Sequence, residues 1–429
     1  HFDFCAQIRR HGTKSLEVIC MRVVFITPMD PFNVGGGAIS AYRFIEPLKS
    51  LYRKGKIDDY RIIYLKKSDT APVEDTDKFL YFPKRRLDRV RTAFRLNASP
   101  LELHSEEILS VLTEFNPNVI IMHFSTLGNL SKQIRKSLKN VKIIQNFDNF
   151  ELGNTQHLGR GFLGKLSSIP MTYLIRKSER EALKSSNTVI FLRVDEANEI
   201  MKYYGIEKPY LIMPFTLGYS DPERYSASRK VRESFHGELR LLFTGSLDAW
   251  FNVEAVEFTA KNIDEIAKTL ADKGIENFKV IIAGKDPGGL ANLNKTCSNI
   301  TVIPNPSQSQ IEELFLSSHI FISPVFSGAG MKTKIVEALY HGIPIVASDT
   351  SLRGYRADVG DAIGKYIFPF KDMEITSFLS GLSSAAKVVL RQDTDKLCRE
   401  IIDLYNDIYG IERFEQLLLR AIDMCFRSH

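Results

Sequence analysis

The sequence predicts an α/β protein made of two doubly wound parallel-sheet domains. Short β-branched runs alternate with helical patterns along the whole chain, which is typical of βαβ units. The chain has 429 residues, about three times the usual size of a single domain. Hydrophobic residues make up 44% and charged residues 25% of it, an ordinary globular composition that gives each half enough apolar material for a core.

The first domain is expected at residues 21–215, after a leader or artificially added extension at residues 1–20. Its strands are predicted at Arg22–Ile26, Arg61–Leu65, Val119–Met122, Lys142–Gln145, Thr188–Leu192 and Tyr210–Met213. Because open α/β sheets bind ligands at the carboxyl ends of their strands, the loops that follow these strands are the places to look for chemistry.

The second domain is expected at residues 216–400. Turn-forming residues at Thr216–Glu223 predict the linker that precedes it. Its strands are predicted at Leu239–Phe243, Phe278–Ala283, Ile300–Ile303, His319–Ser323, Ile343–Ala347 and Lys365–Phe368. The remaining segment, residues 401–429, is expected to be helical, with an amphipathic helix at Ile411–Phe426 packed on the body.

Several classes of protein are excluded by composition. The five cysteines are scattered and include no CxxC motif, so neither a disulfide framework nor a zinc site is indicated. Apolar stretches such as Val119–Met122 are far shorter than the roughly 20 residues that a spanning helix needs. A cytoplasmic protein is expected, either free or peripheral on the inner face of the membrane.

Three consecutive glycines, Gly35, Gly36 and Gly37, lie between the first strand and a helical pattern. Backbone N–H groups at such a position can approach an anion, because no side chain blocks the helix N-terminus. A phosphate or sugar of a nucleotide donor is therefore a candidate ligand. The alternative interpretation is a flexible strand-to-helix turn.

The strongest motif is the segment Ser323–Ser348, which reads as a buried strand, a glycine loop, a helix and a second strand. The helix N-terminus and the two cations Lys332 and Lys334 would lie together, which favours binding of a diphosphate. Glu337, farther along the same helix, could accept hydrogen bonds from ribose hydroxyls. An ordinary βαβ unit with solvated lysines is the alternative.

This segment resembles the donor-binding signature of GT-B glycosyltransferases of family 4, the group 1 glycosyltransferases. Leu241–Asn252 and Val280–Lys285 are similar to other parts of that family's nucleotide domain, so the resemblance covers roughly residues 239–350. It implies a GT-B architecture of two Rossmann-like domains facing across a cleft. It also implies retention of anomeric configuration and a nucleotide-diphospho-sugar substrate, UDP-sugar above all, with no cofactor and no metal.

By position, the resemblance assigns donor binding to a set of residues in the glycine-rich loops and the helix after the last of them. They are Gly35, Gly36, Gly37, Gly245, Ser246, Gly328, Ala329, Gly330, Met331, Lys332, Thr333 and Glu337. Ala329 stands where the family commonly has a glutamate that contacts the donor sugar. The family's frequent Arg…Lys pair after Gly245 is also absent, which leaves Lys332, Lys334 and Arg353 to neutralise the leaving phosphates.

His123 and Asp148 follow neighbouring predicted strands of the first domain, and with Lys334 they are the candidate catalytic residues. His123 or Asp148 could position an acceptor hydroxyl or act as a general base. A retaining reaction needs no protein base, because the leaving phosphate can take the proton. A hydrogen-bonded core histidine and an Asx turn are the alternatives.

Two Asp-Thr-Asp sequences, at residues 75–77 and 393–395, match a metal-nucleotide motif only formally. Neither follows a predicted strand beside the diphosphate loop, so no metal site is predicted.

Positive charge is concentrated in the first domain. Residues 1–215 carry a net charge of +10 and residues 216–429 carry −4. The segment Lys84–Arg95 adds apolar residues at helical spacing among its basic ones, which is typical of a helix drawn to an anionic membrane surface. A solvated basic helix is equally compatible, and nucleic acid is not expected because no aromatic stacking platform accompanies the charge.

The sequence thus predicts a retaining hexosyltransferase that acts on a hydroxyl of a glycan, a lipid-linked intermediate or a protein glycan. Two alternatives remain: a nucleotide-sugar epimerase of similar fold, and a non-catalytic subunit that binds an acceptor or a partner enzyme.

Overall fold

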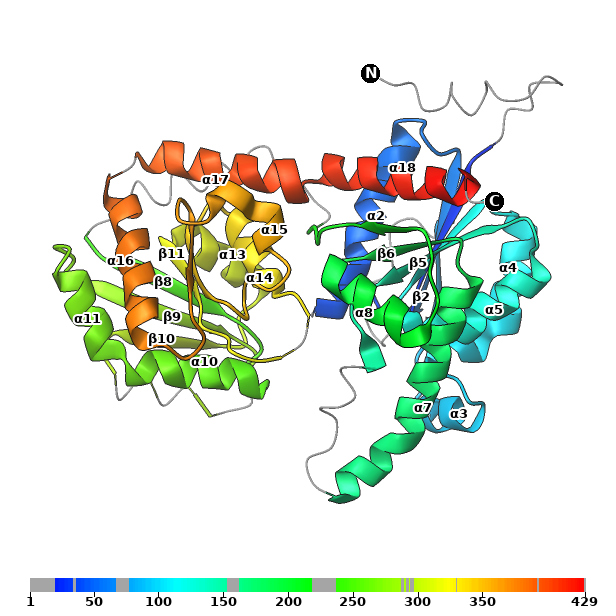
Figure 1. Cartoon of the computed structure of the whole chain (residues 1–429), viewed down its shortest axis with the longest axis horizontal. Coiled ribbons are helices and arrows are strands. Elements are labelled where there is room, and N and C mark those ends of the chain that lie inside the picture. The colour runs from blue at the N-terminus through cyan, green and yellow to red at the C-terminus, as the bar shows by residue number, and fades with distance from the viewer. Residues whose placement is uncertain are drawn as a thin grey trace. The chain divides into compact units, whose positions relative to one another are not determined.

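The computed structural model describes residues 20–33, 36–66, 77–152, 162–217, 237–286, 289–290, 293, 297–328, 330–391 and 393–427. The chain forms two compact units (Figure 1), the first made of residues 1–219 and 411–429 and the second of residues 220–410. The sequence-based division instead ends the first domain at residue 215 and keeps residues 401–429 together. In the structure the last helix returns to the first unit.

The first unit contains a seven-stranded sheet in the order β3-β2-β1-β4-β5-β6-β7. All neighbouring strands are parallel. The strands are β1 Arg22–Thr27, β2 Asp59–Lys66, β3 Phe79–Pro83, β4 Val119–His123, β5 Lys142–Phe147, β6 Thr188–Phe191 and β7 Tyr210–Ile212. The helices are α2 Gly36–Arg53, α3 Asp88–Phe94, η1 Pro100–His104, α4 Ser105–Phe115, η2 Ser125–Leu127, α5 Gly128–Ser137, α7 Phe162–Ser185, α8 Val194–Tyr204 and α18 Ile411–Arg427.

The second unit contains a six-stranded parallel sheet in the order β10-β9-β8-β11-β12-β13. Its strands are β8 Leu239–Thr244, β9 Phe278–Gly284, β10 Ile300–Pro304, β11 Ile320–Ser323, β12 Ile345–Ser348 and β13 Ile367–Phe370. The helices are α10 Trp250–Lys261, α11 Ile263–Ala271, α13 Gln308–Ser317, α14 Thr333–Tyr340, α15 Arg356–Val359, η3 Gly360–Ala362, α16 Ile375–Arg391 and α17 Thr394–Tyr409.

Helices cover both faces of the first sheet, which explains why its central strands are apolar without alternation. On one face Phe25 of β1 packs in one core with Phe44 of α2 and Phe414 of α18. On the other face Val24 of the same strand packs with Leu130 of α5. The prediction of two doubly wound parallel-sheet domains is confirmed.

One strand of the first sheet escaped prediction. β3 is a five-residue edge strand that ends at Pro83, and two of its residues, Tyr81 and Pro83, are exposed. A proline at the end of a short edge strand is compatible with the sheet, because its missing N–H is not needed there. The sequence pattern gave β3 no alternation long enough to distinguish it from a loop.

Within the part of the chain that the structure describes, no helix is long and apolar enough to cross a membrane.

Candidate functional sites at the sheet edges

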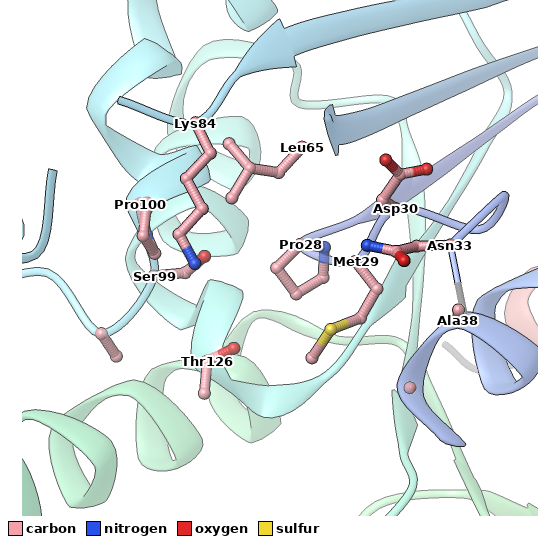
Figure 2. Close-up of a pocket in the computed structure, with 12 residues that line it drawn as sticks. Pro28, Met29, Asp30, Asn33, Ala38, Leu65, Lys84, Ser99, Pro100 and Thr126 are labelled. Carbon is pink, nitrogen blue, oxygen red and sulfur yellow. The ribbon is translucent and has the colours of Figure 1, made fainter. Parts of the chain in front are cut away.

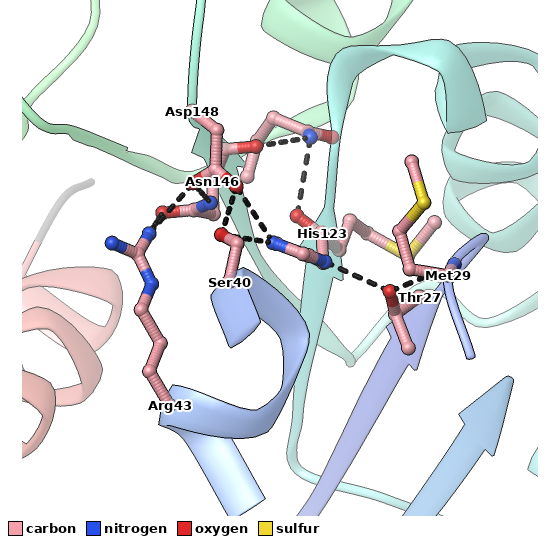
Figure 3. A network of polar contacts seen from close by, with 9 residues as sticks. Thr27, Met29, Ser40, Arg43, His123, Asn146 and Asp148 are labelled. Atoms are coloured by element: carbon pink, nitrogen blue, oxygen red, sulfur yellow. Dashed lines mark hydrogen bonds and ion pairs between the residues drawn. The ribbon is translucent and has the colours of Figure 1, made fainter. Parts of the chain in front are cut away.

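A buried polar network lies at the carboxyl ends of β4 and β5 in the first unit (Figure 3). His123 Nε2 lies 3.0 Å from Asp148 Oδ2 and 3.2 Å from Ser40 Oγ, and Ser40 also donates to Asp148. Arg43 Nη2 donates to Asp148 Oδ1 at 2.6 Å. The network therefore ties the first turns of α2 to the ends of two central strands.

Charge in this network is balanced within it. Burial opposes ionisation of Asp148, yet the guanidinium of Arg43 and the contacts with His123 and Ser40 hold the pKa of that carboxyl well below its usual range. Burial lowers the pKa of His123, and the charge of Arg43 adds to this shift. At neutral pH the network thus holds a carboxylate, a guanidinium and a neutral imidazole.

The hydrogen bonds also assign the tautomer of His123. Ionised Asp148 can only accept, so its contact with His123 places the proton on Nε2, which donates to Asp148. Nδ1 of the neutral ring then accepts from Thr27 Oγ1 at 2.8 Å, and the same hydroxyl oxygen accepts from Met29 N. His123 has no exposed surface, so in this form it holds the loop after β1. Its predicted role toward an acceptor hydroxyl stays a prediction, as does that of Asp148.

A pocket of about 460 Å³ lies in the first unit (Figure 2). Its lining comes from the loops after β1, β3 and β4, the start of α2, the end of β2 and the segment leading into η1: Pro28, Met29, Asp30, Asn33, Gly37, Ala38, Leu65, Lys84, Ala98, Ser99, Pro100 and Thr126. Lys84 enters from one side, and Asp30 and Asn33 enter from the other. Its volume is in the range of small-molecule sites, and the polar groups on both walls suit a hydroxylated ligand.

The glycine segment borders this pocket. Gly36 is the first residue of α2, and a Cβ added at Gly37 would lie 3.1 Å from the Met29 sulfur. A side chain at residue 37 would therefore push Met29 against the pocket wall. Gly35 lies outside the described residues.

In the second unit, the loops after β8 and β9 pack directly on each other. A Cβ at Gly284 would lie only 1.7 Å from the carbonyl oxygen of Gly245, so the two backbones can approach only without a side chain there. Asn252 Nδ2 donates to the carbonyl of Ser246 at 2.8 Å, which fixes the predicted donor loop to the start of α10.

The loop between β11 and α14 reaches the same edge of the sheet. Gly328 and Gly330 have φ values of 91° and 74°, a region that favours glycine. Lys332 Nζ donates to the carbonyl of Ser327 at 3.2 Å and lies 4.8 Å from the ring centre of Phe251. Lys332 therefore contacts α10, the helix that follows the Gly245 loop.

Lys332 lies in an environment that disfavours its charge. Burial lowers its pKa to about 8, and the charge of Arg353 adds to the shift. Its backbone carbonyl accepts a hydrogen bond from the fully buried Tyr355 at 2.9 Å. An anion beside Lys332 would stabilise the ammonium and offset the repulsion from Arg353.

The N-terminus of α14 is the third part of this arrangement. Its N-cap residue, Lys332, makes no side-chain cap hydrogen bond, so the first N–H groups of the helix are suited to an anion. Met331 precedes the cap, and Thr333 and Lys334 form the first turn. Lys334 Nζ contacts both oxygens of Glu337, at 2.9 and 2.8 Å.

The structure brings most of the predicted donor residues to the carboxyl ends of the strands of the second sheet. Gly245 and Ser246 lie in one loop, and Gly328 and Gly330 lie in another that reaches α10 through Lys332. Met331, Thr333, Lys334 and Glu337 follow on α14 or just before it. Ala329 lies outside the described residues.

Several buried polar residues of the first unit were not predicted. Ser40 and Arg43 belong to the first turns of α2, and helical periodicity alone marks them only as polar positions. Burial raises the pKa of Glu102 and of Glu179 to about 7. Glu102 accepts hydrogen bonds from the N–H groups of Asn129 and Leu130 in α5. No pattern in the neighbouring sequence shows which glutamate of a polar segment will be buried.

The Asp-Thr-Asp sequence at residues 393–395 lies at the start of a helix. Asp75 lies outside the described residues, and Asp393 is the N-cap of α17, where it accepts from Asp395 N at 2.8 Å. Among the residues that the structure describes, no group of three His, Cys, Asp or Glu side chains is placed to hold a metal ion.

Comparison with known proteins finds a family match within the second unit. Residues 238–382 match the family described as "Glycosyl transferases group 1". No curated protein matches this chain.

Many solved structures share the fold. Sucrose-phosphate synthase from Thermosynechococcus elongatus superposes with a TM-score of 0.64 at 12% identity, over 95% of this chain and 100% of that one. HepE from Anabaena, in complex with UDP and glucose, has a TM-score of 0.60 at 12% identity, over 94% of this chain and 99% of that one. The lipopolysaccharide outer core galactosyltransferase WaaB, in its apo form, has a TM-score of 0.60 at 13% identity, over 93% of this chain and 99% of that one. These likenesses show the GT-B fold.

Proposed function

We propose that this chain, whose residues 238–382 match the glycosyl transferases group 1 family, is a retaining hexosyltransferase that uses a UDP-sugar. One observation carries the proposal. Lys332 is the N-cap of α14, without a side-chain cap hydrogen bond, and Lys334 lies in the first turn of that helix, which follows β11. Two cations and a positive helix end at a ligand-binding edge suit a diphosphate.

The donor is expected to lie along the loops after β8 and β11. Its diphosphate would contact Lys332, Lys334 and the first N–H groups of α14. Glu337 would accept hydrogen bonds from the ribose, because a carboxylate has about four acceptor positions and Lys334 uses only some of them. The choice of UDP is supported by the UDP bound in HepE.

In the proposed reaction the bond between the anomeric carbon and the diphosphate oxygen breaks, and the acceptor oxygen bonds to that carbon on the same face. The acceptor proton passes to an oxygen of the leaving diphosphate. Lys332 and Lys334 neutralise the charge that develops on that group, which is the main contribution asked of the protein. No metal is assigned a part.

The acceptor is proposed to bind in the pocket of the first unit. Its walls mix apolar and polar groups, and it lies where the strands of that sheet end. A hydroxyl of a glycan, a lipid-linked intermediate or a protein glycan fits this chemistry.

Lys334→Ala tests the assigned diphosphate site. Removal of one charge-assisted contact is worth about 1.5–3 kcal/mol, so calorimetry should show UDP binding weakened roughly tenfold or more. Lys371→Ala is the matched control, because Lys371 also contacts a glutamate three residues later, Glu374, at 3.5 Å. Equal UDP affinities for the two variants would contradict the assignment.

Turnover distinguishes the proposed activity from its alternatives. When a UDP-sugar is incubated with the protein alone, UDP should be released slowly or not at all. The rate of UDP release should rise when an acceptor hydroxyl is added. If the UDP-sugar is converted to a different UDP-sugar when no acceptor is present, the protein is an epimerase. If the protein binds UDP but releases no UDP from a UDP-sugar with any added acceptor, it is a non-catalytic subunit.

A further inference from the structure

The helix α3 exposes the side chains that a surface helix normally buries. Leu87, just before it, and Val90 and Phe94 within it are 60%, 53% and 85% exposed. The polar residues Asp88 and Thr92 are buried instead, at 2% and 5%. This is the reverse of the usual arrangement, in which the apolar stripe faces the core.

Helical spacing explains the arrangement. Leu87, Val90 and Phe94 are three and seven residues apart and so project from one side of the helix. Asp88 and Thr92 are four apart and project from another side. Their side chains are occupied, since Asp88 Oδ2 accepts from Arg85 N at 2.6 Å and Thr92 donates to the Asp88 carbonyl at 2.5 Å. The buried polar groups thus find hydrogen-bond partners within the helix and the residues just before it, and the apolar face is left to solvent.

The apolar face is bordered by cations. We call Leu87, Val90, Phe94 and the neighbouring Leu96, which is 54% exposed, together with Arg85, Arg86, Arg91 and Arg95, the α3 surface. All four arginines are exposed. Between residues 84 and 96 the only acidic residue is Asp88, and it is buried. The surface therefore presents apolar groups and positive charge with no exposed negative charge between them.

This combination favours a lipid surface over other partners. Apolar side chains flanked by arginines can enter the boundary between headgroups and acyl chains while the guanidinium groups contact anionic lipid. A nucleic acid would use the arginines but would leave the aliphatic side chains exposed. The +10 net charge of residues 1–215 attracts the same anionic surface at longer range.

The α3 surface adjoins the pocket along the chain. Lys84 lines the pocket, and Arg85 is the next residue. We propose that the α3 surface docks on an anionic phospholipid bilayer, and that the pocket beside it takes the headgroup of a lipid-linked acceptor. The second half of this inference rests on the proposed function, whereas the docking does not.

Vesicle co-sedimentation of the full chain tests the docking. The protein should bind vesicles of phosphatidylcholine mixed with phosphatidylglycerol and should bind pure phosphatidylcholine much more weakly. High salt should reduce binding to the mixed vesicles. Equal binding to both kinds of vesicle at low and high salt would overturn the proposal.

Two variants separate the apolar and the cationic contributions. Phe94→Ser and the double variant Arg86→Gln/Arg95→Gln should each lower the vesicle partition coefficient by about tenfold. The matched controls are Leu390→Ser, at a residue 51% exposed on α16, and Lys371→Gln. Both controls should bind vesicles as the unchanged chain does. Because all these positions are exposed, the melting temperatures should also stay unchanged.

Two further results decide the interpretation. If Phe94→Ser binds vesicles as well as the unchanged chain, or if an RNA oligonucleotide displaces the protein from vesicles and binds Phe94→Ser undiminished, the bilayer proposal is wrong. UDP affinity should be the same for every α3 variant. For the unchanged chain, vesicle binding without UDP binding would contradict the proposed function alone, and UDP binding without vesicle binding would overturn the docking alone.

Discussion

At the scale of single residues, the buried ion pair of Arg43 and Asp148 dominates the first-unit site. The side chain of Arg43 has no exposed surface and that of Asp148 is 6% exposed. Two rings, Phe44 and Phe215, lie 5.1 and 5.3 Å from the guanidinium carbon. A charge in such surroundings is tolerated only with its partner, because desolvation of a lone ion costs several kcal/mol.

Asp148→Asn should therefore destabilise the first unit by about 3–5 kcal/mol, since it leaves the Arg43 guanidinium buried without a counter-charge. Chemical denaturation followed by a probe in the first unit measures this change, because two units need not unfold together. Asp195→Asn is the control, because Asp195 is 67% exposed where it pairs with Arg193, and its loss should cost under about 1 kcal/mol. Equal costs for the two variants would refute the account of the network.

The ionisation of Lys332 predicts how donor binding depends on pH. Its pKa of about 8 in the absence of ligand means that the ammonium is lost as pH rises through that value. If a diphosphate contacts this ammonium, UDP affinity should fall about tenfold between about pH 7 and about pH 9.

Calorimetry at several pH values measures this dependence, with Lys332→Arg as the control. Arginine keeps its charge throughout that range, so its UDP affinity should not change with pH. A wild-type affinity that is flat across the same range would show that Lys332 does not contact the nucleotide.

At the scale of elements, the close approach of β8 and β9 shapes the end of the second sheet where the donor is proposed to bind. Gly284→Ala would place a methyl group 1.7 Å from the Gly245 carbonyl oxygen, so the strands must separate. We expect a loss of at least about 3 kcal/mol in the stability of the second unit. Gly289→Ala is the control, because a Cβ there meets nothing within 4 Å. Similar melting temperatures for both variants would contradict this prediction.

The two sites differ in how far the sequence predicts them. Most of the donor residues lie in a single segment, Ser323–Ser348, whose strand, glycine loop and helix are local features. The first-unit network joins residues far apart in the chain, such as Ser40 and Asp148, which are separated by 108 residues. His123 and Asp148 were found because each follows a strand, but their partners on α2 carry no pattern beyond helical periodicity.

At the scale of the whole molecule, the strands other than β3 and the final helix were predictable, but the unit to which that helix belongs was not. Its amphipathic pattern shows that one face is buried and does not identify the surface that buries it. In the structure α18 packs on α2, with Phe414 and Phe44 ring centres 5.2 Å apart and Lys54 Nζ 2.7 Å from Glu415 Oε2. The chain thus completes its first unit only after its second.

The central claim is that this two-unit chain binds a nucleoside diphosphate in its second unit, at Lys332, Lys334 and the N-terminus of α14. Isothermal titration calorimetry of the full chain with UDP, GDP, ADP and CMP tests it most directly. The account predicts binding of UDP, one site per chain, and a clear preference for UDP over CMP, because the diphosphate supplies the charge that Lys332, Lys334 and α14 attract. Absence of binding by all four nucleotides would contradict it.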